Sequence, residues 1–309
     1  MPRTSMERRV SRRVKTLAIG LTVGSGMLVS TAAVAAQAAG RPTAPVGRLN
    51  KIIENAEAGR VSFGGGESWI LLPDLEHDLF GPIRLQAAMA ANWDSTTGRF
   101  KAVPGVRINQ EANHQAKHIV KQTLDAGMML LVLPQSETPE QVAEFISAMR
   151  YPPQGQFYAT GPRGQRGWSA GAAARYWGVD TETYMRKADV WPLNPEGELL
   201  ACILIETKSI VEHIEEVIEL PGLGCMLIGT QDMTMNYGLG TPAPAGNHPI
   251  ILAAIERVAR ACAAHHARGG KVICGAYQTP HGLAKNVEEF GFRIFTGGRG
   301  NPPYTGDRR

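Results

Sequence analysis

The feature that most constrains the fold is a strand–helix–strand pattern over residues 199–240. An apolar run at 201–205 ends at Glu206, and a second at 225–228 is followed by a short turn and Asp232. Uninterrupted apolar runs of this length are typical of strands buried on both faces. The segment between them has helical periodicity, and Ser209 with Glu212 predicts a capping box at its start. Such a crossover makes the two strands parallel, so their carboxyl ends lie at one edge of the sheet.

Glu206 and Asp232 are the first candidate site residues, because each follows one of these two strands. Neighbouring strands lie about 5 Å apart, so both carboxylates can approach one cation. Two oxygen ligands with room for water suit Mg²⁺ or Mn²⁺ better than zinc. The alternative is that both acids only cap strand ends or pair with Lys or Arg.

Strand and helix patterns alternate along the rest of the chain. The eight strand candidates are residues 61–63, 69–72, 103–108, 128–133, 201–205, 225–228, 272–276 and 293–296. Eight such units over roughly 250 residues favour an α/β fold of the TIM (β/α)8-barrel type. A doubly wound open sheet is the alternative, but no glycine-rich phosphate-binding sequence follows the first strand.

The predicted barrel is incomplete at both ends. Only five residues separate Phe63 from Trp69, whereas a parallel crossover needs a dozen or more, so the first barrel helix is missing. Strand 61–63 then either lies outside the barrel or pairs irregularly and leaves a seam beside Asp74 and His77. Gly- and Pro-rich sequence follows the last strand, so no eighth helix is expected. Exposed apolar edges favour a homo-oligomer, or else reduced stability.

Residues 1–40 are typical of an export signal. Six Arg or Lys lie among the first fifteen residues, followed by an uncharged stretch at 16–36 and small-x-small cleavage sites at 33–35 and 36–38. The sequence at 11–15 resembles a twin-arginine signal. We therefore expect a periplasmic or extracellular protein without a stable membrane span. A general secretory signal and an uncleaved membrane anchor are the alternatives.

The remaining chain is predicted to be one barrel domain at 49–309 after a linker at 41–48. The net charge of +4 is due to the basic N-terminal residues, so nucleic acid is not an expected partner. The four cysteines lie in apolar strand or helix candidates without C-x-x-C spacing. We interpret them as small buried apolar residues rather than as disulfides or zinc ligands.

An insertion at 154–198 is rich in arginine and aromatic residues. One interpretation is a lid or subunit-docking arm over the barrel mouth, with Arg166 reaching a distal carboxylate of the substrate. The other, which we favour for most of its aromatic residues, is an ordered loop that packs on the barrel.

Barrel enzymes carry their chemistry at the carboxyl ends of the strands. Those ends hold Asp74 and His77 after the second strand, Arg107 in the third, and Glu206 and Asp232 after the fifth and sixth. An acid–base pair, a fixed cation and two metal ligands therefore face one mouth. Taken singly, His77 could be a surface histidine and Arg107 could pair with a nearby acid.

Several segments together resemble the HpcH/HpaI aldolase and citrate lyase family. The matching segments are residues 74–77, 106–108, 124–127, 150–153, 205–207, 221–222 and 229–232. They occur in consistent order over about 49–297. The resemblance implies metal-dependent pyruvate aldolases on a TIM barrel. The chain departs from the family at Leu204, where a glutamine is usual, and at Thr230, where a proline is usual.

The resemblance implies a role for each acidic residue after the fifth and sixth strands. Glu206 and Asp232 correspond to ligands of a divalent cation, Mg²⁺, Mn²⁺ or Co²⁺. A 2-oxo acid substrate would bind the same ion, and backbone amides near Gln231 and Asp232 would hold its carboxylate.

The resemblance also implies roles for the acid–base pair and the cation. His77, oriented by Asp74, corresponds to the general base that removes the proton from the substrate hydroxyl. Arg107 corresponds to the group that stabilises the developing enolate oxygen.

The expected function is a divalent-metal-dependent aldolase that cleaves a 4-hydroxy-2-oxo acid into pyruvate and an aldehyde. One alternative is a lyase of malyl- or citryl-type thioesters, although the sequence offers no basic cluster for a coenzyme A phosphate near the mouth. Another is an exported protein that binds metal and 2-oxo acid without turnover.

Overall fold

A computed structural model describes residues 47–78, 81–108, 112–240 and 246–298. The predicted export signal, most of the predicted linker and the region of the predicted missing eighth helix lie outside these residues. In the part of the chain that the structure describes, no helix is both long and apolar enough to cross a membrane.

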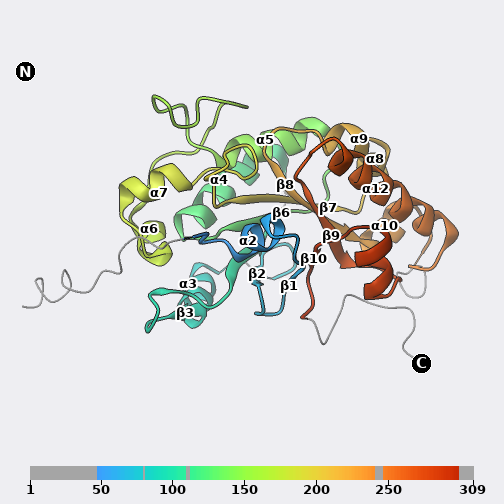
Figure 1. Cartoon of the computed structure of the whole chain (residues 1–309), viewed down its shortest axis with the longest axis horizontal. Helices are drawn as coiled ribbons and strands as arrows, with labels where there is room; N and C mark the ends of the chain where they lie inside the picture. Colours follow the sequence, from blue (N-terminus) through green and yellow to red (C-terminus); the bar gives the residue numbers. More distant parts are fainter. Residues whose placement is uncertain (1–46, 79–80, 109–111, 241–245, 299–309) are drawn as a thin grey trace, which may run out of the picture. The chain divides into compact units, whose positions relative to one another are not determined.

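Eight parallel strands form one sheet that curls into a nearly closed barrel (Figure 1). The strands are β1 (Ser62–Phe63), β2 (Trp69–Asp74), β5 (Val103–Arg107), β6 (Leu130–Leu133), β7 (Leu200–Ile205), β8 (Leu223–Gly229), β9 (Ile273–Gln278) and β10 (Ile294–Phe295). Their order in the sheet is β1-β10-β9-β8-β7-β6-β5-β2. All eight predicted strands and the TIM-barrel class are confirmed.

Helices alternate with the strands. A short hairpin of β3 (Trp93–Asp94) and β4 (Arg99–Phe100) follows the first helix after β2. The helices are α2 (Lys51–Glu57), α3 (Pro82–Asn92), α4 (Ala112–Asp125), α5 (Pro139–Met149), α6 (Gly171–Trp177), α7 (Thr181–Lys187), α8 (Lys208–Glu212), α9 (Ile214–Val217), α10 (Thr230–Asn236), α12 (Pro249–Ala267) and the π-helix η1 (Lys285–Glu289). The central strands β7 and β8 are buried along their whole length, as their apolar sequences predict.

The predicted capping box at Ser209 and Glu212 is wrong. The cap of α8 is Thr207, whose side chain accepts a hydrogen bond from the Ile210 N–H at 3.1 Å. Ser209 already lies inside the first turn and donates to the Glu137 carbonyl instead. The helix also breaks at His213 into α8 and α9.

The predicted seam lies between β1 and β2, the two ends of the sheet. β1 pairs in parallel with β10, with Ser62 opposite Ile294, so strand 61–63 belongs to the barrel. The link from β1 to β2 is a tight turn in place of a helix. Gly64 permits the close approach of this turn to β10, because a Cβ there would lie 2.1 Å from the Thr296 carbonyl oxygen.

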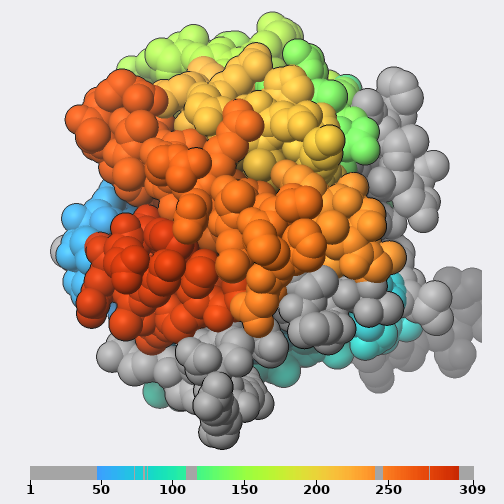
Figure 2. Space-filling model, turned by 90° about the vertical axis from the view of Figure 1, so that its right-hand side faces the viewer, coloured from blue at the N-terminus to red at the C-terminus, as the bar shows by residue number. Residues whose placement is uncertain are grey.

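A cavity of about 860 Å³ adjoins the β1 edge of the sheet. Residues of α2 and β1 line one side, and Leu283, Val287 and Glu288 line the other. Figure 2 shows the same neighbourhood, with blue residues of α2 beside the red C-terminal elements. The structure therefore has a cavity beside the edge where the sequence lacks its first helix.

The insertion at 154–198 lies between α5 and β7, so it belongs to the amino ends of the strands and does not form a lid over the mouth. Trp177 donates to the carbonyl of Gly127, just before β6. Arg166 is buried and donates to Asp125 and to the Tyr184 hydroxyl. The lid interpretation, including a contact of Arg166 with substrate, is wrong, and the packing interpretation is confirmed.

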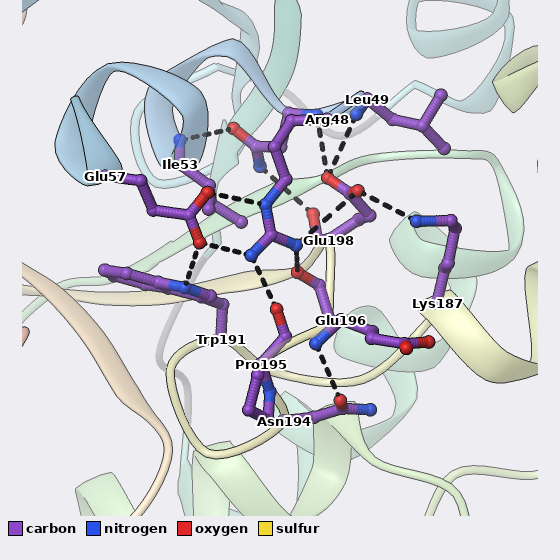
Figure 3. A network of polar contacts seen from close by, with 12 residues as sticks. Arg48, Leu49, Ile53, Glu57, Lys187, Trp191, Asn194, Pro195, Glu196 and Glu198 are labelled. Atoms are coloured by element: carbon purple, nitrogen blue, oxygen red, sulfur yellow. Dashed lines mark hydrogen bonds and ion pairs between the residues drawn. The ribbon is translucent and has the colours of Figure 1, made fainter. Parts of the chain in front are cut away.

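Figure 3 shows how the end of the insertion binds the segment before α2. Glu198 accepts hydrogen bonds from the Leu49 and Asn50 N–H groups at 3.2 and 2.9 Å. Its carboxylate also lies 3.3 Å from Lys187 Nζ and 3.7 Å from Arg48 Nη1. The side chain of Asn50 caps α2 and donates to the Glu198 carbonyl. These hydrogen bonds hold the start of α2 against the end of the insertion.

The prediction that all four cysteines are free thiols is wrong. Cys202 pairs with Cys225, and Cys262 pairs with Cys274. Their predicted burial is confirmed. Cys202 and Cys225 are opposite one another in the register of β7 and β8, with Cα atoms 4.5 Å apart. The pairing of Cys202 with Cys225 results from the register of the two strands, and no short sequence spacing indicates it.

Candidate active site

The carboxyl ends of four strands bring the predicted polar residues to one mouth. Asp74 and Arg107 are the last residues of β2 and β5 and face each other in the register of the two strands. Glu206 follows β7 directly, and Asp232 lies in the first turn of α10, directly after β8. Parallel strands fix this convergence, as the sequence predicted.

Arg107 is buried and bound by two carboxylates. Its Nε donates to Asp74 Oδ1 at 2.9 Å, and its Nη2 pairs with Asp74 Oδ2. Nη1 lies 2.7 Å from Glu76 Oε2. Burial alone would lower the pKa of Arg107, but the hydrogen bond with Asp74 and the charges of both acids raise it above its ordinary value. Arg107 is therefore a permanent, fixed cation.

Glu76 is a site residue that the sequence analysis missed. Its Oε2 lies between Arg107 and His77, 3.7 Å from His77 Nε2. Asp74 binds Arg107, so Glu76 and not Asp74 is the acid beside the imidazole, which corrects the expected Asp74–His77 pair. Glu76 lies in the turn directly after β2, and the available signal was a second acid beside the strand-end Asp74.

Glu206 is almost fully buried, and its Oε1 accepts a hydrogen bond from the Gln135 N–H at 2.6 Å. Burial raises the pKa of Glu206 to about 8, although the Gln135 hydrogen bond opposes the shift. The charges of Glu76 and Asp232 contribute to the same upward shift of this pKa. Gln135 has a φ of 50°, which is uncommon outside glycine and aims its N–H at the carboxylate.

The mouth carries an excess of negative charge. Asp74, Glu76, Glu206 and Asp232 are linked by contacts or charge interactions, and Arg107 is the cation among them. Glu76 Oε2 is buried without a hydrogen bond, since its contact with Arg107 is an ion pair of poor hydrogen-bond geometry. This donor set suits a divalent cation.

The described residues contain no group of three or more His, Cys, Asp or Glu arranged as a metal cage. A cation held by Glu206 and Asp232 alone would keep coordination positions for water or substrate. Gln231 lies beside Asp232 in the first turn of α10. Leu204 is buried in β7, so the position usual for glutamine adds no polar group to the barrel interior.

Tyr277 is a second residue that the sequence analysis missed. It lies on β9, and its ring covers Arg107, with the guanidinium carbon 5.2 Å from the ring centre. Burial raises the pKa of Tyr277, and the charges of Asp74, Glu76 and Glu206 add to the shift against the effect of Arg107. A single tyrosine in a strand pattern carries no signal that distinguishes this role from core packing.

Curated relatives of this chain are named 2-keto-3-deoxy-L-rhamnonate aldolase. The protein of Klebsiella pneumoniae is 35% identical over 145 residues, which cover 47% of each chain. The protein of Salmonella gallinarum is 30% identical over 196 residues, 62% of this chain and 61% of the relative. The chain thus spans about half to three-fifths of the length of these relatives.

Solved structures share the fold. An HpcH/HpaI aldolase/citrate lyase family protein from Burkholderia cenocepacia is 24% identical with a TM-score of 0.58, over 80% of this chain and 92% of that one. Macrophomate synthase is 21% identical with a TM-score of 0.53, over 81% and 82% of the two chains. The family model for HpcH/HpaI aldolase/citrate lyase matches residues 67–296. The chain therefore belongs to the HpcH/HpaI aldolase/citrate lyase family.

Proposed function

We propose that this protein is a divalent-metal-dependent aldolase that cleaves a 4-hydroxy-2-oxo acid into pyruvate and an aldehyde. The carrying observation is the acidic character of the mouth, where four carboxyl groups, among them Glu206 with its raised pKa, surround the guanidinium of Arg107 in the described part of the chain. A cation held by Glu206 and Asp232 would balance that charge. Membership of the family and the aldolase names of its relatives support the reaction class.

The metal would act as a Lewis acid that polarises the keto group of the substrate. Mg²⁺, Mn²⁺ and Co²⁺ all fit two carboxylate ligands with further positions for oxygen. Gln231 and Asp232 lie in the first turn of α10, where the backbone N–H groups lack partners within the helix. We assign these groups to the substrate carboxylate.

Arg107 would stabilise the enolate oxygen that develops when the carbon–carbon bond breaks. A guanidinium has five N–H groups, of which two donate to Asp74, while Nη1 forms an ion pair with Glu76. N–H groups that do not donate to Asp74 would bind the substrate. Two acids already hold Arg107 before the charge develops, which lowers the reorganisation that the reaction requires.

His77 would take the proton from the substrate hydroxyl and return it later. Its side chain is 63% exposed, so substrate or water can reach it. Glu76, at 3.7 Å, is placed to favour the imidazolium that forms. The proton then passes to the pyruvate enolate, which completes the reaction.

The test is pyruvate release from 4-hydroxy-2-oxo acids with added Mg²⁺, Mn²⁺ or Co²⁺. We expect Glu206→Gln and His77→Ala to lower kcat by at least a hundredfold, and the exposed Glu182→Gln on α7 to leave it unchanged. Turnover without metal, or full activity of Glu206→Gln, rejects the mechanism. Cleavage of a malyl- or citryl-type thioester alone would identify the substrate class as thioesters.

A second candidate is a protein that binds metal and 2-oxo acid without turnover. The observation in its favour is that Asp74 binds Arg107, so that among the described residues the acid beside His77 is Glu76, at 3.7 Å. Calorimetry with Mn²⁺ and pyruvate decides this case. Binding by a parent protein that releases no pyruvate from any 4-hydroxy-2-oxo acid would favour it.

A further inference from the structure

The contact between Tyr277 and Arg107 crosses the barrel mouth. Arg107 is on β5 and Tyr277 on β9, and these strands are separated by β6, β7 and β8 on one side of the sheet. On the other side they are separated by β10, β1, the seam and β2. The contact therefore joins the two halves of an unclosed sheet at the level of the site.

The guanidinium of Arg107 is restrained in two different ways. Asp74 and Glu76 bind its edge through Nε, Nη1 and Nη2. Asp74, the last residue of β2, and Glu76, two residues later, both approach from the β2 side of the seam. The Tyr277 ring lies over the guanidinium, 5.2 Å from its central carbon, and comes from the opposite side. An aromatic face attracts a cation and favours a defined plane.

We propose that Tyr277 is a positioning residue for Arg107 in the aldol cleavage. Its ring holds the guanidinium plane so that the N–H groups not donated to Asp74 keep one direction toward the enolate oxygen. This inference rests on the proposed function for its catalytic consequence, whereas the contact itself can be tested without turnover. The ring, and not the hydroxyl, carries the effect.

The kinetic test compares Tyr277→Leu, Tyr277→Phe, Arg107→Lys and the double variant Arg107→Lys/Tyr277→Leu. We expect Tyr277→Leu to lower kcat on the order of tenfold with KM changed less than threefold. Tyr277→Phe keeps the ring and should lose less than threefold. In the Arg107→Lys background, Tyr277→Leu should cause no further loss, because lysine has no plane to hold.

The matched control is Tyr176→Leu, which removes a tyrosine stacked beside Arg175 at 5.6 Å, away from the mouth. It should leave kcat unchanged. Equal losses from Tyr277→Leu in both Arg107 backgrounds would overturn the proposal. So would a Tyr277→Phe variant as slow as Tyr277→Leu, since that result assigns the effect to the hydroxyl.

The same variants are also compared by urea unfolding, which does not depend on activity. If the ring binds Arg107, Tyr277→Leu lowers the unfolding midpoint more in the parent than in the Arg107→Lys background. Equal shifts would reject the contact. A parent protein without pyruvate release rejects the proposed function instead, and the unfolding comparison still decides whether Tyr277 holds Arg107.

Discussion

At the scale of single residues, the site is defined by buried charge. Glu206 is buried against Glu76 and Asp232, and all three are acids. A carboxylate in this position is stable only if it takes up a proton or gains a cation. The proposed metal-bound form would therefore differ from the metal-free form in the protonation of Glu206, which makes pH a direct probe of the site.

Without metal, the stability of the protein should fall as pH rises from about 4.5 to about 8. The folded pKa of Glu206 is raised to about 8 from an ordinary value of 4.5, so within this window the folded state binds more protons than the unfolded state. The free energy of unfolding then decreases with pH, by at most about 1.4 kcal/mol per unit. Urea unfolding in EDTA at pH 5.5, 6.5 and 7.5 measures the slope.

Glu206→Gln is the control for this slope, because an amide does not titrate. The variant should show a flatter pH dependence and exceed the parent in stability at pH 7.5 without metal. At that pH, adding Mn²⁺ should raise the stability of the parent and leave the stability of Glu206→Gln unchanged. Parallel pH profiles of the two proteins would contradict the assignment.

At the scale of elements, periodicity predicted the strands well because each is a continuous buried run with a turn on either side. It placed Asp74, Arg107, Glu206 and Asp232 at one mouth, since parallel topology fixes which strand ends meet. It could not show that Asp74 binds Arg107 rather than His77, or that Tyr277 reaches across from β9. Those contacts depend on side-chain direction and on the barrel's curvature, which no local pattern encodes.

The insertion is fixed by a buried ion pair, which predicts a large cost for removing one partner. Arg150 donates to Asp189 at 2.7 and 3.0 Å, and both side chains are 1% exposed. Arg150 also donates to the carbonyls of Thr160 and Pro162. Arg150→Met leaves Asp189 buried and unpaired, so we expect about 3–5 kcal/mol lower stability by urea unfolding.

Two comparisons make this result specific. Lys208→Met removes an exposed i, i+4 pair with Glu212 and should cost less than about 0.5 kcal/mol. Arg150→Met/Asp189→Leu removes both charges and should recover part of the loss. Because the insertion lies at the amino ends of the strands, the folded variants should keep the parent kcat. A loss near that of Lys208→Met would show that the buried pair is not formed.

At the scale of the whole molecule, the barrel is unclosed in its hydrogen bonding but cross-linked covalently. One disulfide joins β7 to β8, the strands that precede Glu206 and Asp232, and the other joins α12 to β9. The cross-links therefore lie in the half of the barrel that carries both proposed metal ligands. Disulfides are typical of exported proteins, so this pattern supports our proposal that residues 1–40 direct export.

The disulfides should contribute strongly to stability, because each restricts the unfolded chain. The bridges close segments of 23 and 12 residues, for which loop entropy predicts about 3 kcal/mol each. Urea unfolding of the oxidised protein should therefore shift to lower urea with reductant, and Cys202→Ala/Cys225→Ala should reproduce about half of that shift. A variant with all four cysteines replaced by alanine should be insensitive to reductant. Since all four cysteines are paired, thiol titration of the oxidised protein in denaturant should find no free thiol, and four reactive thiols would refute both bridges.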